Sequence, residues 1–324
     1  MHFSRVQSAL NTLLKAADSN GILELDSGRP GPVAAITALT HGNEISGILT
    51  AEHIVAGIQS GVWRLAAGKL QVFLANYEIL RDATGFEELT RHRGLDLNRI
   101  WGADRQPVAD DQPGSNEFGI RERLLPWLSK ADYLIDLHST SLKSTPIGIL
   151  LTDSPGTLDR VCEVLDVPYV LPNIGQYLTG TAMIERHHEF VSDRLDKKQS
   201  GSSASFSLVI EAGQHFDFST VDRNVDNVAA LLQMVDVLDG APRQLSNQAL
   251  RLNTYFVGLA ESAGNVIEWV YTDAPAGFDF IAGGTHVCNL HGQPVYAEND
   301  SYVVMPQLQA RNPGQELFYL TAPF

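Results

Sequence analysis

The chain has 324 residues, which suits one large domain with a smaller domain beside it. Hydrophobic residues make up 44% and charged residues 19% of the chain, the ordinary composition of a globular protein without disorder. The formal net charge of −15 argues against nucleic acid or an anionic membrane surface as the main partner, although a few converging arginines still permit a small anionic substrate.

The first 20 residues predict an amphipathic helix packed on the domain and carry no secretory signal. No apolar run approaches the roughly 18 residues that a transmembrane helix needs, so we expect no membrane partner. Cys162 and Cys288 lie far apart and show neither metal-ligand spacing nor a disulfide framework. We therefore expect a reduced, cytoplasmic setting.

Strand and helix patterns alternate up to about residue 240. Strands are predicted at 21–25, 33–39, 70–76, 133–138, 147–151, 169–171 and 206–211, and helices at 44–60, 117–130, 155–165, 181–190 and 221–238. This alternation predicts an α/β fold with a mixed, mostly parallel sheet flanked by helices. The segment 77–94 is expected to be irregular, 102–116 is a candidate active-site loop, and 197–205 is a flexible polar loop.

The pattern changes after a linker at 241–247. Short strand-like runs separated by Gly and Pro follow at 253–256, 266–271, 285–289, 295–297, 302–305 and 317–320. We therefore predict a catalytic α/β domain over residues 1–244 and a smaller all-β domain over residues 245–324 that covers the active-site cleft.

The first candidate site residues follow the strand at 33–39. His41 comes directly after it, and Glu44 stands three positions later, where a helix is predicted to begin. On the first turn of a helix, residues three apart share one face. An imidazole nitrogen and a carboxylate oxygen held in this way suit Zn²⁺. Alone, such a pair is weak evidence, because most His-x-x-Glu pairs are polar surface residues.

Two later strands also end in polar residues, His138 and Glu211. In one mixed sheet these ends can meet the His41–Glu44 turn at a common edge. Two His and one Glu form a catalytic zinc set that leaves the fourth position open, and Glu211 remains as a general base and acid. Asp136, two residues before His138, should lie on the same side of its strand, where it either supports the ligand or serves the fold.

Arg91, Arg93 and Arg99 cluster within nine positions. A guanidinium group binds a substrate carboxylate with two parallel hydrogen bonds, and another near the reacting carbonyl would stabilise the oxyanion. The alternative is a solvated basic loop.

Four motifs stand in an order that resembles the succinylglutamate desuccinylase/aspartoacylase family, a branch of the zinc carboxypeptidase-like hydrolases. They are His41-Gly42-Asn43-Glu44, Leu95-Asp96-Leu97-Asn98-Arg99, Asp136-Leu137-His138 and Ile210-Glu211-Ala212-Gly213. The β-rich tail, with Tyr302-Val303-Val304-Met305-Pro306, is similar to the family's C-terminal domain, so that the resemblance covers roughly residues 30–320.

The resemblance implies that His41, Glu44 and His138 bind one Zn²⁺ per chain and that Glu211 is the general base and acid. It further implies that Asn98 and Arg99 bind the substrate carboxylate.

For the arginine that polarises the carbonyl, Arg91 fits the family by position. Arg93 competes with it, because the family's Arg-Tyr pair is replaced by Arg91-His92-Arg93. Tyr302 is the candidate for the aromatic residue that the second domain lends to the pocket. A further substrate arginine of the family has no clear counterpart within 197–205.

These residues predict a zinc-dependent amidohydrolase that cleaves the linear amide of a small anionic N-acyl amino acid, of acetyl or succinyl type. The alternatives are a metallocarboxypeptidase acting on peptides and, in another class, a non-catalytic binding protein of the same fold. The acyl group, the amino acid and a homo-oligomeric state stay open. The adjacent His187 and His188 are interpreted as surface or pocket-rim residues.

Overall fold

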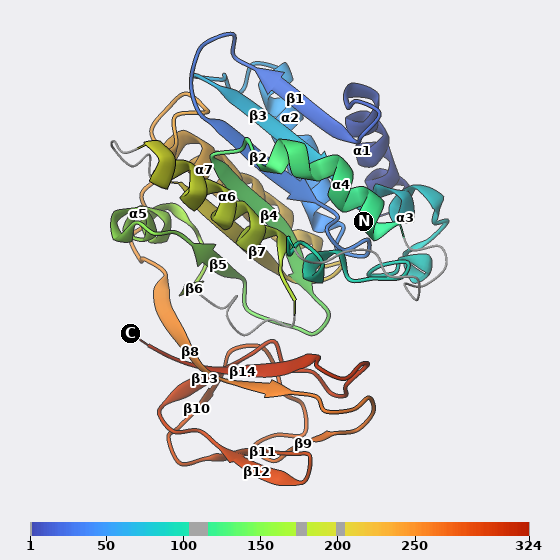
Figure 1. The fold of residues 1–324 in the computed structure, drawn as a ribbon, viewed down its shortest axis with the longest axis vertical. Helices are drawn as coiled ribbons and strands as arrows, with labels where there is room; N and C mark the ends of the chain where they lie inside the picture. Colours follow the sequence, from blue (N-terminus) through green and yellow to red (C-terminus); the bar gives the residue numbers. More distant parts are fainter. Residues whose placement is uncertain (1, 104–115, 173–179, 199–204, 324) are drawn as a thin grey trace.

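The computed structural model describes residues 2–103, 116–172, 180–198 and 205–323. A mixed, mostly parallel sheet forms the centre of the α/β part, as predicted (Figure 1). Its strands follow the order β1-β3-β2-β4-β7-β5-β6, in which β1 and β5 run antiparallel to their neighbours β3 and β7. The strands are β1 (Ile22–Asp26), β2 (Val33–Ala38), β3 (Lys69–Leu74), β4 (Tyr133–Thr140), β5 (Ile147–Leu151), β6 (Tyr169–Pro172) and β7 (Phe206–Gln214).

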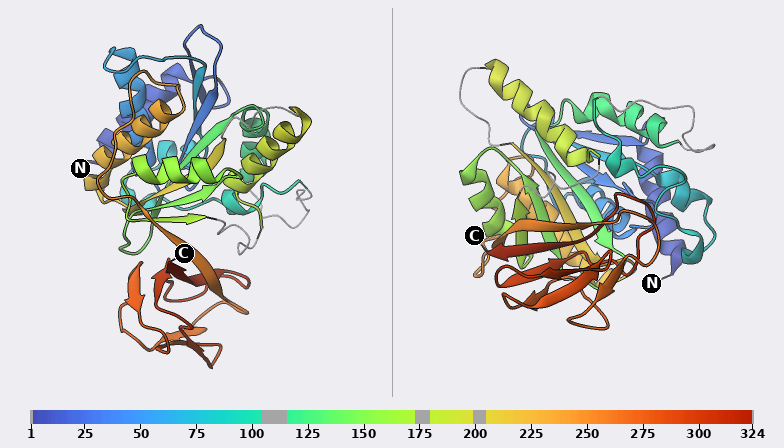
Figure 2. Two further views of the ribbon diagram at one scale, coloured as in Figure 1. Left: turned by 90° about the vertical axis from the view of Figure 1, so that its left-hand side faces the viewer. Right: turned by 60° about the horizontal axis from the view of Figure 1, so that its bottom comes forward.

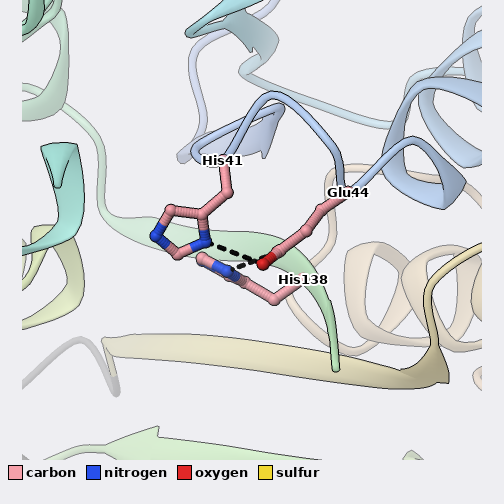
Figure 3. Close-up of side chains that lie close together, drawn as sticks. All are labelled: His41, Glu44 and His138. Carbon is pink, nitrogen blue, oxygen red and sulfur yellow. Dashed lines mark hydrogen bonds and ion pairs between the residues drawn. The ribbon is translucent and has the colours of Figure 1, made fainter. Parts of the chain in front are cut away.

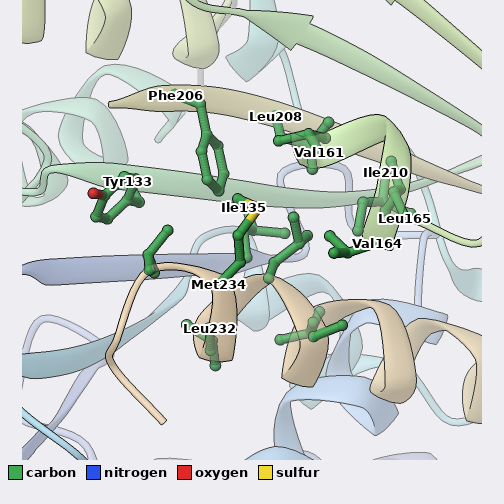
Figure 4. Packing of buried hydrophobic residues seen from close by; sticks show 14 of the residues in the cluster. Tyr133, Ile135, Val161, Val164, Leu165, Phe206, Leu208, Ile210, Leu232 and Met234 are labelled. Atoms are coloured by element: carbon green, nitrogen blue, oxygen red, sulfur yellow. The ribbon is translucent and has the colours of Figure 1, made fainter. Parts of the chain in front are cut away.

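Helices cover both faces of this sheet because its inner strands are almost entirely apolar. On one face lie α1 (Phe3–Ala16), α2 (Ser46–Gln59), α5 (Pro155–Val164) and α7 (Val221–Met234), and on the other lie α4 (Glu117–Leu128) and α6 (Met183–Lys198). Figure 4 shows sheet residues such as Ile135 and Leu208 packed against Leu232 of α7 and Val161 of α5.

The segment between β3 and α4 is more regular than the sequence predicts. It contains α3 (Tyr77–Asp82) and two short 3-10 helices, Phe86–Glu88 and Leu97–Arg99. These elements are too short for hydrophobic periodicity to reveal them. Most of the predicted loops at 102–116 and 197–205 lies outside the described residues.

The C-terminal part is antiparallel β structure, as expected (Figure 2). β8 (Leu250–Leu259) pairs in parallel with β6 and then antiparallel with β14 (Glu316–Pro323), which continues through β13 (Ser301–Val304) to β10 (Asp279–Ile281). A second sheet contains β12 (Gln293–Tyr296), β11 (His286–Leu290) and β9 (Ile267–Trp269). The sequence analysis missed β10, which has only three residues.

Strand direction positions the site. β2, β4 and β7 are parallel neighbours, so their carboxyl ends meet at one edge of the sheet. The register places Thr37 beside Asp136 and His138 beside Glu211. Within the described residues, no helix combines the length and apolarity needed to cross a bilayer.

Candidate active site

A tight turn after β2 holds the first two site residues. The Glu44 amide donates to the His41 carbonyl at 3.1 Å, and α2 begins only at Ser46. The pair is therefore held by a turn that precedes the helix, which corrects the prediction of a first helical turn. Gly42 is required here, because a Cβ atom at this position would lie 2.5 Å from the Ile79 side chain.

His41, Glu44 and His138 form a buried cluster at the sheet edge (Figure 3). His41 Nδ1 lies 2.8 Å from Glu44 Oε1, and His138 Nδ1 lies 2.9 Å from Glu44 Oε2. The candidate ligand atoms all lie within 4.8 Å of one another, and none of the three residues is more than 3% exposed.

Two aspartates hold the other nitrogen of each imidazole. His41 Nε2 lies 3.0 Å from Asp96 Oδ1, and His138 Nε2 lies 2.8 Å from Asp136 Oδ2. Thr40 Oγ1 donates to the second oxygen of Asp136 at 2.7 Å. The strand spacing predicts that Asp136 and His138 share one side, whereas the partnership of Asp96 with His41 depends on tertiary structure.

This arrangement fits a cation. A neutral imidazole has one N–H, and donating it to the aspartate leaves the Nδ1 lone pair directed at Glu44. Two such lone pairs and a carboxylate would repel one another unless a proton or a metal ion lies between them. The donor set, two imidazole nitrogens and a carboxylate oxygen, is one that Zn²⁺ binds.

The pKa shifts of Glu44 and His138 also indicate that this cluster favours positive charge. Burial raises the pKa of Glu44, but the neighbouring charges of His41 and His138 outweigh it and hold that pKa well below its ordinary value. Burial lowers the pKa of His138, but Asp136 and Glu44 raise it well above its ordinary value. The cluster therefore stabilises positive charge beside Glu44.

Glu211 lies beside this cluster on β7, opposite His138. Its side chain is buried, and no described residue bonds to its Oε2 atom. Burial raises the pKa of Glu211 to about 7. A carboxyl group with a pKa near neutrality can both accept and return a proton at neutral pH.

The structure separates the two candidate arginines. Arg91 lines the cavity and contacts Glu44 Oε1 at 3.3 Å and Asp96 Oδ2 at 3.0 Å. Arg93 instead pairs with Asp82 at 2.6 Å and donates to the Glu78 carbonyl, outside the cavity lining. Together with Arg81, it lowers the pKa of Asp82 to about 2. The Arg93 guanidinium is therefore bound to residues of α3 and lies away from the candidate site.

Asn98 and Arg99 both line the cavity. Asn98 Oδ1 accepts from the Met183 amide at 2.9 Å, which ties the 3-10 helix to the start of α6. Arg99 is fixed by the Asn98 carbonyl at 2.9 Å and by Glu316 at 3.2 Å. Glu316, a residue that the sequence analysis did not identify, stands at the start of β14.

Tyr302 lies outside the cavity lining. Its ring packs against Tyr169 and Phe280, with centroids 5.1 Å and 5.8 Å away. Tyr302 therefore belongs to an aromatic cluster, in which its ring is packed against those of its neighbours.

The site opens into a cavity of 560 Å³, a volume typical of small-molecule pockets. One wall is the sheet edge with the His41–Glu44–His138 cluster, Glu211 and Arg91. The opposite wall comes from the C-terminal β region and includes Met305, Pro306 and residues 311–316. His215, which the sequence analysis also missed, belongs to the first wall.

The adjacent histidines of α6 are not a pair of surface residues. His187 is fully buried, with Nδ1 2.6 Å from Ser207 Oγ and Nε2 3.1 Å from the Ala131 carbonyl. Burial lowers the pKa of His187 to about 3, so it is a neutral core residue. His188 contacts Asp153 at 3.3 Å.

A comparison with known protein families identifies the domain that contains the His41–Glu44–His138 cluster. Residues 30–178 match the succinylglutamate desuccinylase/aspartoacylase catalytic domain. The match spans a little under half of the chain and identifies residues 30–178 with that family's catalytic domain. The family is one of hydrolases that deacylate N-acyl amino acids. No curated protein sequence matches the chain.

Solved structures of this family share the fold across almost the whole chain. Succinylglutamate desuccinylase from Chromobacterium violaceum has a TM-score of 0.67 and 16% identity, covering 100% of this chain and 98% of its own. The enzyme of the same name from Vibrio cholerae has a TM-score of 0.67 and 14% identity, covering 93% and 85%. The product-bound ectoine utilization protein EutE (DoeB) from Ruegeria pomeroyi has a TM-score of 0.61 and 15% identity, covering 90% and 86%. At these identities, the likeness establishes the fold.

Proposed function

We propose that this protein is a zinc-dependent deacylase that hydrolyses the amide bond of a small anionic N-acyl amino acid. The observation that supports it best is the buried His41–Glu44–His138 donor set beside the unpartnered carboxyl of Glu211, in one cavity of ligand size. We also propose that residues 1–244 supply the chemistry and residues 245–324 cover the cleft.

His41, Glu44 and His138 would hold Zn²⁺, and Asp96 and Asp136 would orient the two imidazoles from outside the ligand set. When bound, zinc would polarise the scissile carbonyl and acidify a water molecule. The three protein ligands leave one coordination position for this chemistry.

Glu211 would take the proton from the attacking water and return it to the leaving nitrogen, so the carboxyl cycles between both forms. Its pKa of about 7 suits both transfers at neutral pH. Attack places negative charge on the former carbonyl oxygen. Arg91 has the position and charge to stabilise that oxygen, because it lines the cavity beside Glu44.

Asn98 and Arg99 would bind the carboxylate of the amino-acid part. The Asn98 side chain is held by the Met183 amide and the Arg99 guanidinium by the Asn98 carbonyl, so little ordering is needed when a substrate binds. Residues 311–316 line the cavity, and we propose that this wall limits the length of a ligand and favours small substrates over peptides.

The deciding experiment is a hydrolysis screen of N-acetyl, N-succinyl and N-formyl amino acids, with short peptides included, on the zinc-loaded protein. We expect amine release from one acyl class, and a loss of about 10²–10⁴-fold in kcat for Glu211→Gln with zinc content unchanged. Activity confined to peptides would identify a metallocarboxypeptidase. A wild type that binds no zinc, or that cleaves none of these amides, would overturn the proposal.

A further inference from the structure

The ladder between β4 and β7 is irregular immediately beyond the site. His138 pairs with Glu211, but the next recorded partners are Thr140 and Gln214, so β7 contains one residue more than β4 over this step. The bulge includes Gly213, whose φ of +104° suits glycine. Bulges near active sites commonly redirect a side chain, and here His215 is the residue directly after β7, one position beyond Gln214, where pairing resumes.

Two contacts fix His215 on the cavity wall. Its amide donates to the Thr140 carbonyl at 2.8 Å, and its ring Nδ1 lies 2.8 Å from Ser139 Oγ. The Ser139 amide in turn donates to Glu44 Oε2 at 3.1 Å. The imidazole is therefore connected to the metal cluster through one serine.

The backbone is strained at the next residue, Phe216. Its φ is +64°, a left-handed conformation that a bulky side chain rarely adopts, and its ring is 43% exposed. It packs against Phe86 with ring centroids 5.3 Å apart. Backbone strain of this kind is concentrated at functional sites, where the surrounding structure maintains it.

One nitrogen of His215 remains available to a ligand. Nδ1 is engaged by Ser139, and no described residue hydrogen-bonds to Nε2. The ring lines the same cavity as Glu211 and Arg91, and burial lowers the pKa of His215, which keeps the imidazole neutral at neutral pH. Ser139 is only 4% exposed, so its hydroxyl supports the ring and is poorly placed to attack a substrate.

We propose that His215 determines substrate specificity, with Nε2 forming a hydrogen bond to a polar group of the bound N-acyl amino acid and Ser139 acting as its positioning residue. This inference rests on the proposed function, because it assigns a contact to the same substrate.

The test compares three variants with the zinc-loaded wild type on its best substrate. We expect His215→Leu to raise KM about 5- to 10-fold, the usual effect of one lost hydrogen bond, with a smaller change in kcat and no change in zinc content. His215→Gln restores a hydrogen-bonding group near Nε2 and should recover part of the loss. His53→Leu, at an exposed position outside the cavity, is the matched control and should leave KM unchanged.

A double-mutant cycle tests the role of Ser139. Ser139→Ala should raise KM less than His215→Leu does, and the double variant should be no worse than His215→Leu alone, since the serine acts through the histidine. An active wild type whose KM is insensitive to His215→Leu, or a loss confined to kcat, would overturn the inference and leave the proposed function intact. A wild type inactive on the whole panel would overturn both.

Discussion

The two walls of the cavity are built differently. The sheet-edge wall contains buried, hydrogen-bonded or ion-paired side chains at the ends of β2 and β4, such as His41, Glu44 and His138, and one oxygen of Glu211 on β7 has no partner among the described residues. The opposite wall is largely the connection between β13 and β14, where Arg311 and Asn312 are exposed. A buried, hydrogen-bonded wall keeps reacting groups in one geometry, whereas an exposed loop can change its residues without disturbing a core. We therefore expect the chemistry to depend on the first wall and the choice of substrate to depend partly on the second.

After the loss expected for Glu211→Gln, the largest difference in kcat should separate variants of the two neighbouring arginines, Arg91 and Arg93. Arg91→Met removes the cation beside Glu44 and should lower kcat by about 10²–10³-fold, the usual result of losing an oxyanion-stabilising group. Arg93→Met is the matched control, because Arg93 pairs with Asp82 away from the cavity, and it should retain nearly full activity. Steady-state kinetics of both variants checks this. A large loss for Arg93→Met with an active Arg91→Met would reverse the assignment.

The pH dependence of kcat/KM tests the buried base. Because Glu211 must be ionised to accept a proton, activity should fall about tenfold per pH unit below the pKa, which burial raises to about 7. Positive charge from bound zinc favours the carboxylate, so the midpoint in the loaded enzyme should lie at or below this value. Initial rates between pH 5 and 9 would show the profile. Activity that rises as the pH falls through this range would contradict the role of Glu211 as a base.

The smallest effect, a change in KM, should come from Glu316 in the wall formed by the C-terminal β region. Glu316 pairs with Arg99, so it offsets part of the charge that a substrate carboxylate would meet. Glu316→Gln should therefore lower KM about threefold with kcat unchanged, in line with the modest energy of a partly exposed ion pair. Titration of the initial rate against substrate measures this change. A rise in KM would instead show that Glu316 is needed to hold Arg99 in place.

The sequence predicts most of the α/β framework and the sheet-edge wall because both depend on local patterns. The strands at 33–39 and 206–211 are apolar runs, and their ends carry His41 and Glu211 within a few residues. Parallel strand direction then brings these ends together with His138. The roles assigned to the site residues remain predictions that the proposed experiments address.

What the sequence could not predict depends on contacts between distant segments. Glu316 meets Arg99 across 217 positions, and Asp96 meets His41 across 55. His215 lines the cavity just beyond a bulge in the β4–β7 ladder, and no residue pattern in the sequence marks that register shift. His187 and His188 are adjacent in sequence, but helix geometry buries one and leaves the other nearer the surface.

β5 runs antiparallel to β7, and this direction has a consequence for how such an enzyme can diversify. Residues 141–144 line the cavity, and the segment 141–146 is anchored in the sheet at both ends, by β4 and by Ile147, the first residue of β5, which lies opposite Glu211. Insertions or deletions in this segment would reshape the space around a ligand and leave His41, Glu44 and His138 in place. The segment is therefore a natural position for laboratory evolution of new substrate preferences on an unchanged hydrolytic centre.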